Sequence, residues 1–192
     1  CILLLSLFCV MGVAHAQITV DAIEARHEIG DQLLVLEDSS GRMGIAEVLE
    51  ADRTGLFQLK GSKSFKIGYK KATYWTKFTI SNRSDSNQKL ILEYFFNRAG
   101  KVVDLYYSSE NGAPVKIAST DKQDPAQLQP LSHRFIAFPL TLKAQETVAY
   151  YSRIENRAFL DLDHTLYTES GFAENYKNNY VFFGAFFGIM FI

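Results

Sequence analysis

The sequence has 192 residues, of which 47% are hydrophobic, 14% aromatic and 21% charged, and its formal net charge is −1. This interspersed and balanced charge excludes a basic nucleic-acid-binding surface and an acidic solvating tail, so we expect no nucleic-acid partner. Both cysteines, Cys1 and Cys9, lie in the first ten residues, so disulfides cannot stabilise the rest of the chain.

Residues 1–16 have the pattern of a signal peptide. The apolar run Ile2–Val13 is followed by Ala14-His15-Ala16, a small-residue cleavage pattern, so we place the mature start at Gln17. The alternative is a buried apolar strand or helix. Neither an initiator Met nor a basic stretch precedes the run, so we expect the chain to be a fragment. Roughly 160 exported residues remain, enough for one domain with a core.

The first exported segments mix strand, helix and loop patterns. Ile18–Asp31 is polar and mixed, with a lead-in strand as one interpretation, and Gln32–Asp38 reads as a strand that ends in a turn. Met43–Ala51 carries apolar residues at a spacing of three to four, which predicts a short N-terminal helix. Gly55–Gly68, with three glycines and several lysines, predicts a loop.

From Tyr74 onward the apolar residues alternate with a period of two, which is typical of strands with one buried face. Asn111-Gly112 is a strong hairpin-turn pattern, and residues 119–132 form a polar loop. Short strands that are separated regularly by turns predict an all-β sandwich. The strands are expected near residues 74–81, 89–96, 103–107, 136–140, 148–154 and 158–166.

The C-terminal residues divide into two parts. Residues 169–179 are polar and predict a helix that leads toward a membrane. Residues 180–192 are apolar and aromatic without charge or proline, but the run is shorter than the roughly 20 residues that cross a bilayer. Gly184 and Gly188 have the spacing at which membrane helices approach closely. We predict a truncated first transmembrane helix after a sandwich domain at residues 17–168; the alternative is a buried core helix.

The order of these segments resembles a known family. The stretches are LLVLEDSSGRMGIAEVLEA (33–51), IGYKKATYWTKFTISNRS (67–84), LILEYFFNRAGKVVDLYY (90–107), HRFIAFPLTL (133–142), VAYYSRIENRAFLDLDHTLYT (148–168) and YVFFGAFFGIMFI (180–192). They look like the second type of extracellular sensory domain of bacterial seven-transmembrane receptors with diverse intracellular signalling modules. Lys77 stands where that family usually has arginine.

The resemblance implies a jelly-roll β-sandwich of the galactose-binding-like kind, seven membrane helices and an intracellular output that this chain does not contain. It also implies attachment to the inner membrane, with the domain facing the periplasm. A ligand-sensing role follows from the same resemblance, with a carbohydrate or related small molecule as the ligand.

The sequence shows no catalytic constellation. Asp161, Asp163 and His164 form the densest polar cluster, but on one strand His164 would point away from both carboxylates. A solvated strand face therefore explains the cluster better than a metal site. His27 and His133 are isolated, and no serine has a nucleophile-elbow pattern around it. We expect no catalytic residue, metal or cofactor, and no enzyme activity in this fragment.

Sugar recognition needs flat apolar surfaces for ring faces and planar polar groups for hydroxyls. Trp75 is either a stacking platform or an anchor that packs under the predicted helix, and Tyr151 and Arg153 are either ligand contacts or cross-strand partners. Arg134 falls on an inward face, which indicates either the end of a strand or a paired interior charge. The candidate ligand-binding residues, whose strand adjacency the sequence does not reveal, are Trp75, Lys77, Asp104, Tyr106, Arg134, Tyr151 and Arg153.

Two functional hypotheses follow. In the first, a ligand-bound sandwich biases the first membrane helix. In the second, the domain is a membrane-anchored module for protein interaction or dimerisation, as a possible homo-oligomer, with exposed aromatics such as Tyr106, Tyr151 and Phe159 as interface anchors. A membrane-anchored enzyme is a third hypothesis, which the missing catalytic cluster disfavours.

Overall fold

A computed structural model describes residues 17–23, 25–61, 66–97, 101–109, 112–121, 123–124, 130–131, 134–157, 159–177 and 181. Within those ranges no helix is long and apolar enough to span a membrane. The predicted signal peptide (1–16) lies outside the described residues, as does the predicted transmembrane helix apart from Val181. Both stay predictions.

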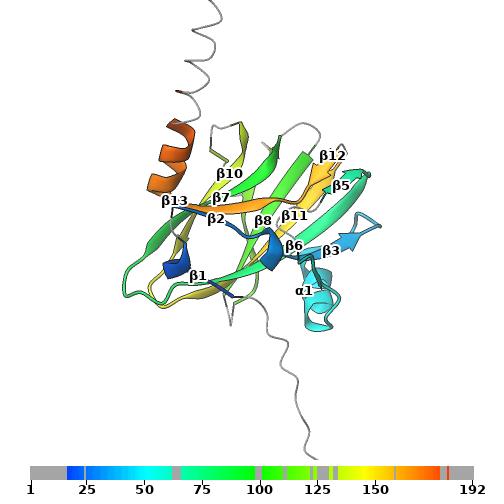
Figure 1. Ribbon diagram of the computed structural model, residues 1–192. Coiled ribbons are helices and arrows are strands. Elements are labelled where there is room, and N and C mark those ends of the chain that lie inside the picture. Colours follow the sequence, from blue (N-terminus) through cyan, green and yellow to red (C-terminus); the bar gives the residue numbers. More distant parts are fainter. Residues whose placement is uncertain are drawn as a thin grey trace, which may run out of the picture.

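The larger sheet has seven strands in the order β4-β3-β6-β11-β8-β9, with β1 pairing in parallel against β6 (Figure 1). All its other ladders are antiparallel. The strands are β1 (Gln17–Thr19), β3 (Leu34–Asp38), β4 (Gln58–Leu59), β6 (Ala72–Ser81), β8 (Lys101–Ser109), β9 (Val115–Ser119) and β11 (Thr147–Asn156).

The smaller sheet has four strands in the order β10-β7-β13-β2, and a separate two-stranded ladder joins β12 to β5. Their bounds are β2 (Arg26–Glu28), β5 (Lys66–Tyr69), β7 (Gln88–Asn97), β10 (Phe135–Leu142), β12 (Phe159–Asp161) and β13 (His164–Thr168). The helical elements are η1 (Val20–Ala22), η2 (Gly30–Gln32), α1 (Ile45–Arg53) and an unlabelled helix at 169–177.

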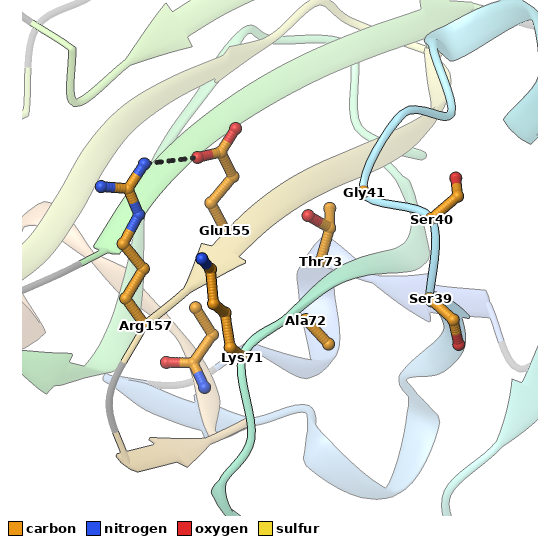
Figure 2. A pocket seen from close by; sticks show the side chains of 9 residues that line it. Ser39, Ser40, Gly41, Lys71, Ala72, Thr73, Glu155 and Arg157 are labelled. Atoms are coloured by element: carbon orange, nitrogen blue, oxygen red, sulfur yellow. Dashed lines mark ion pairs between the residues drawn. The ribbon is translucent and has the colours of Figure 1, made fainter.

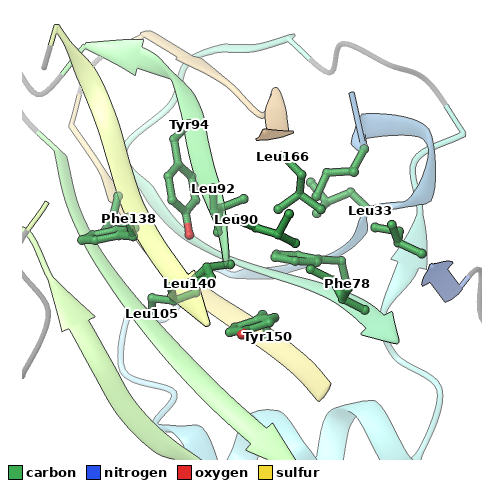
Figure 3. Packing of buried hydrophobic residues seen from close by; sticks show 14 of the residues in the cluster. Leu33, Phe78, Leu90, Leu92, Tyr94, Leu105, Phe138, Leu140, Tyr150 and Leu166 are labelled. Carbon is green, nitrogen blue, oxygen red and sulfur yellow. The ribbon is translucent and has the colours of Figure 1, made fainter. Parts of the chain in front are cut away.

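The two sheets face each other across one apolar core (Figure 3). Phe78 and Tyr150 of the larger sheet stack with ring centroids 5.4 Å apart, while Tyr94 and Phe138 of the smaller sheet meet edge to face at 6.0 Å. Alternation along each strand sends these residues inward and their neighbours outward. The predicted all-β sandwich is therefore confirmed, whereas the jelly-roll, galactose-binding-like connection stays a prediction.

Two polar contacts bridge the sheets inside the core. The hydroxyls of Tyr94 and Ser152 lie 2.6 Å apart, and Thr76 Oγ1 lies 3.2 Å from His164 Nε2. His164 is 1% exposed. The prediction of a solvated strand face was therefore wrong for this residue. Asp161 ends β12 and His164 begins β13, so the predicted cluster does not lie on one continuous strand.

The burial of His164 predicts a loss of stability in mild acid. Burial lowers the pKa of His164 to about 3, whereas an unfolded histidine has a pKa of about 6.5. The unfolded chain therefore binds the extra proton between these values. The stability from the neutral ring is fully present above about pH 6.5 and is about 2 kcal/mol smaller near pH 5. Urea unfolding near pH 6.5 and near pH 5 measures this change in the free energy of unfolding. The same change in the His164→Gln variant would contradict its assignment to His164.

Most predicted strands are confirmed within a few residues, and so are the short helix, found as α1, and the helix at 169–177. Two expectations were wrong. The Gly55–Gly68 segment contains β4 and the start of β5, which pair with β3 and β12. The expected strand at 158–166 is divided between β12 and β13, which belong to different sheets. Short strands that gain their partners from distant segments carry too few residues to show a period.

Candidate functional site

Six of the seven predicted ligand-binding residues lie together on the outer face of the larger sheet. In one row of the sheet Arg153 stands between Trp75 and Asp104. In the next row Tyr151 stands between Lys77 and Tyr106. This adjacency of β6, β11 and β8 turns three separate sequence patterns into one surface.

Helix α1 covers this surface at Trp75, whose side chain is 0% exposed. Trp75 clusters with Val48 of α1, Phe57 and Tyr151, and its ring centroid lies 5.5 Å from that of Tyr106. The interpretation as an anchor beneath the helix is confirmed. In this arrangement Trp75 offers no open ring face to a sugar, so the condition for a stacking platform is not met.

Lys77 and Tyr151 share a carboxylate that α1 supplies. The Lys77 ammonium donates to both carboxylate oxygens of Asp52, at 2.8 and 2.6 Å, and the Tyr151 hydroxyl donates to Oδ2 at 2.8 Å. Burial and the nearby carboxylate of Asp52 raise the pKa of Tyr151, so its phenol stays protonated. These three groups join α1 to the sheet and satisfy one another.

A second polar chain runs along the other row. Asp104 accepts a hydrogen bond from Ser119 at 2.8 Å and lies 3.3 Å from the Lys116 ammonium. Arg153 pairs with Glu155 at 2.6 Å and lies 3.9 Å from Asp104. Cross-strand pairing of Arg153 is thus present. A ligand would have to displace these contacts in order to use the same groups.

Arg134 lies apart from the other six residues. It is exposed in a bend directly before β10 of the smaller sheet, with its guanidinium 5.3 Å from the Phe135 ring centroid. The interior-facing position was therefore wrong, and the strand-end alternative is correct. Because a residue beside a strand start no longer follows the pleat, alternation cannot place it.

A pocket of about 280 Å³ opens at the end of the second polar chain (Figure 2). The turn after β3 forms one wall, because Asp38 accepts hydrogen bonds from the backbone N–H groups of Ser40, Gly41 and Met43. Gly41 has φ of 65°, a conformation that favours glycine. Arg153 donates to the Gly41 carbonyl at 3.3 Å and so connects this wall to the predicted residues.

The lining of this pocket is polar and contains no aromatic side chain. Lys71 and Arg157 are exposed cations, and Figure 2 shows Lys71 beside Arg157 and Glu155. Glu155 lies 2.6 Å from Arg153 and 3.8 Å from Arg157, so its charge is already compensated. Positive charge therefore dominates the lining of the pocket. The full lining is Ser39, Ser40, Gly41, Lys71, Ala72, Thr73, Glu155, Asn156 and Arg157.

Metal chemistry finds no support in the described ranges, where no three His, Cys, Asp or Glu side chains are placed to hold one ion. Asp161, Asp163 and His164, the densest polar cluster of the sequence, form no such group. The prediction that the protein needs no metal or cofactor stays a prediction.

Sequence reasoning missed a contact between the C-terminal helix and the smaller sheet. Glu93 of β7 is only 2% exposed. It accepts hydrogen bonds from Tyr176 of the helix and, at 3.2 Å, from Tyr167 of β13. Phe172 packs between those two tyrosines, with ring centroids 4.7 and 5.5 Å away. The spacing of Phe172 and Tyr176, one helical turn, was the available signal.

A family model described as 7TMR-DISM extracellular 2 matches residues 30–168. No curated protein matches the chain. Among solved structures, an exo-β-1,3-galactanase from Phanerochaete chrysosporium, solved with galactose, is similar at 15% identity and a TM-score of 0.27. That match covers 54% of this chain, which spans a quarter (25%) of the galactanase chain. So distant a likeness carries no argument about this protein.

Proposed function

Because the chain belongs to the 7TMR-DISM extracellular 2 family of receptor sensory domains, we propose that it senses a carbohydrate or related small molecule in the pocket of Figure 2. The bound state would pass through the helix at 169–177 to the first transmembrane helix. The domain would face the periplasm from the inner membrane. The observation that carries the proposal is the polar pocket, joined by Arg153 to the network of predicted residues.

The lining favours an acidic sugar over a neutral one. The Thr73 hydroxyl suits a sugar hydroxyl, and the exposed cations Lys71 and Arg157 suit a carboxylate. The Ser39 and Ser40 hydroxyls already donate to Glu37 and Asp38, at 3.1 and 2.6 Å. Without an aromatic platform, recognition depends on hydrogen bonds and charge rather than ring stacking. Residues such as Trp75 and Tyr151 would then support the pocket from behind rather than contact the ligand.

Isothermal titration with glucuronate and glucose tests this selectivity. We expect glucuronate to bind more tightly. Lys71→Gln should weaken its binding about tenfold, the effect of losing one charge-assisted hydrogen bond. Arg83→Gln, which removes an exposed cation from the turn after β6, serves as the matched control. Equal affinity for both sugars, or an equal loss in both variants, would refute the assignment.

Signalling requires that the ligand prefer one of two arrangements of the receptor, since equal affinity shifts no equilibrium. We therefore expect full-length receptors locked in their on and off states to bind glucuronate with different affinities. Identical affinities would leave a binding domain that has no sensing role.

The alternative of an interaction or dimerisation module has its own supporting observation. Tyr69 of β5 is 88% exposed and Phe159 of β12 is 43% exposed, with their rings edge to face at 5.6 Å. Tyr151, named earlier as an anchor, is buried and unavailable. If this alternative holds, the wild-type chain sediments as a dimer and the Tyr69→Ser/Phe159→Ser variant as a monomer.

A further inference from the structure

A second hollow, of about 590 Å³, shares no lining residue with the pocket of Figure 2. Both sheets line it. Leu90 and Leu140 come from the smaller sheet, whereas Tyr107, Ile117 and Tyr150 come from the larger one. Glu169, the first residue of the C-terminal helix, completes the lining at one side. The hollow is thus the larger of the two and touches the helix that leads toward the membrane.

The apolar wall of this hollow is held in place before any ligand arrives. Tyr150 stacks on Phe78 in the core, and the ring of Tyr107 meets Tyr150 edge to face at 6.0 Å. The Tyr107 hydroxyl donates to Glu146, whose other carboxylate oxygen accepts the Lys143 backbone N–H at 2.7 Å. Burial and Glu146 raise the pKa of Tyr107 to about 12, so this bond persists at neutral pH. Such preorganisation lowers the ordering cost of binding.

Three charged side chains around this wall are left for a ligand. The ammonium groups of Lys89 and Lys143 are exposed, and neither makes an ion pair within the described ranges. The Glu169 carboxylate is likewise exposed and unpaired there. Glu146 uses both oxygens on groups of the protein itself. The four charges in the lining sum to zero, but the ammonium groups of Lys89 and Lys143 keep free donors, and these can receive a carboxylate.

We propose that this hollow is a second ligand site, which takes a small molecule with an apolar body and a carboxylate. The body would lie against Tyr107, Ile117 and Leu140, and the carboxylate would meet Lys89 and Lys143. Burying an apolar body supplies affinity in proportion to the area removed from water, while the two ammonium groups orient the head. Glu169 would accept an ammonium group if the ligand is an amino acid rather than a simple acid.

The lining of this site is connected directly to the C-terminal helix. Glu169 begins the helix, and Tyr176 attaches the helix to Glu93 of β7, the strand that also supplies Lys89 and Leu90. Phe172 packs on Tyr167 of β13. A ligand that moves Lys89 and Leu90 apart from Glu169, or closer to it, changes how the helix lies on the sheet. This link rests on the proposed sensing function, whereas the binding itself does not.

Titration of the purified full chain with phenylacetate and with phenylalanine tests the site by methyl and backbone NMR. We expect shifts at Ile117, Leu140 and Glu169 and none at Ala72, which lines the first pocket. The Lys89→Gln/Lys143→Gln variant should lose at least about tenfold in affinity. The matched control is Lys71→Gln, which removes an ammonium from the first pocket and should leave binding unchanged.

Each result decides the proposal. Tighter binding of phenylalanine that is lost in Glu169→Gln supports the amino-acid class, and tighter binding of phenylacetate supports the simple acid. Binding that is unaffected by the double substitution, or no binding of either compound at millimolar concentration, overturns it. Since glucuronate titration of the same samples reads only Ala72 and its neighbours, failure of this site and failure of the sugar site are separable.

Discussion

Replacing Trp75 by alanine is expected to lower the free energy of unfolding by about 3–5 kcal/mol. The side chain is 0% exposed between β6 and α1, so its removal leaves a cavity that the short helix cannot fill. The loss should also release the Lys77–Asp52 and Tyr151–Asp52 contacts, because α1 would no longer be held at one position. Urea unfolding followed by circular dichroism measures the change.

The matched control for this prediction is Tyr69→Ala, which removes an aromatic side chain that is 88% exposed. Its effect should stay within about 0.5 kcal/mol. Trp75→Phe should lie between the two, because the Trp75 Nε1 has no hydrogen-bond partner and its loss costs no contact. A Trp75→Ala effect as small as that of Tyr69→Ala would show that α1 does not cover the sheet in solution.

Replacing Gly171 by alanine is expected to have the second large effect. The free energy of unfolding should fall by about 2–3 kcal/mol, and the C-terminal helix should be released. A Cβ at this position would lie 2.0 Å from the Ala25 carbonyl oxygen, a backbone atom that cannot move aside alone. The helix would have to lift, which breaks the Tyr176–Glu93 hydrogen bond and exposes Phe172.

Hydrogen exchange of the amides in residues 169–177 measures this release separately from global unfolding. Exchange should become faster in Gly171→Ala and stay unchanged in Ala173→Ser, which alters an exposed position of the same helix. Unchanged exchange in Gly171→Ala would mean that the helix does not depend on its close approach to Ala25. The route that we propose from either pocket to the first transmembrane helix would then need another explanation.

Attachment of this helix matters for the sensing proposal. Figure 1 places it against the side of the sandwich where β13 and β2 lie, and its chain continues directly from β13. Glu93 is a buried carboxylate, and two tyrosine hydroxyls compensate the cost of its burial. Because the sheet and the helix share this carboxylate, we expect a shift of β7 to displace the helix as well.

The sequence alone determined the class of fold. Period-two alternation in Tyr74–Ser81 and its counterparts determines which side chains face the core, because the pleat sends successive residues to opposite faces. The apolar spacing in Met43–Ala51 likewise identified α1, and the order of segments identified the family. These signals come from neighbouring residues or from the order of the segments, so the sequence contains them directly.

Only the tertiary structure decided which outward-facing residues meet. Trp75, Arg153 and Asp104 share a row because β11 pairs with both β6 and β8, and strand order depends on the packing of the whole chain rather than on local periodicity. The same dependence hid the pocket walls at Gly41 and Glu155 and the attachment of Tyr176 to Glu93. Such contacts join residues far apart in the chain, so no periodicity within one segment encodes them.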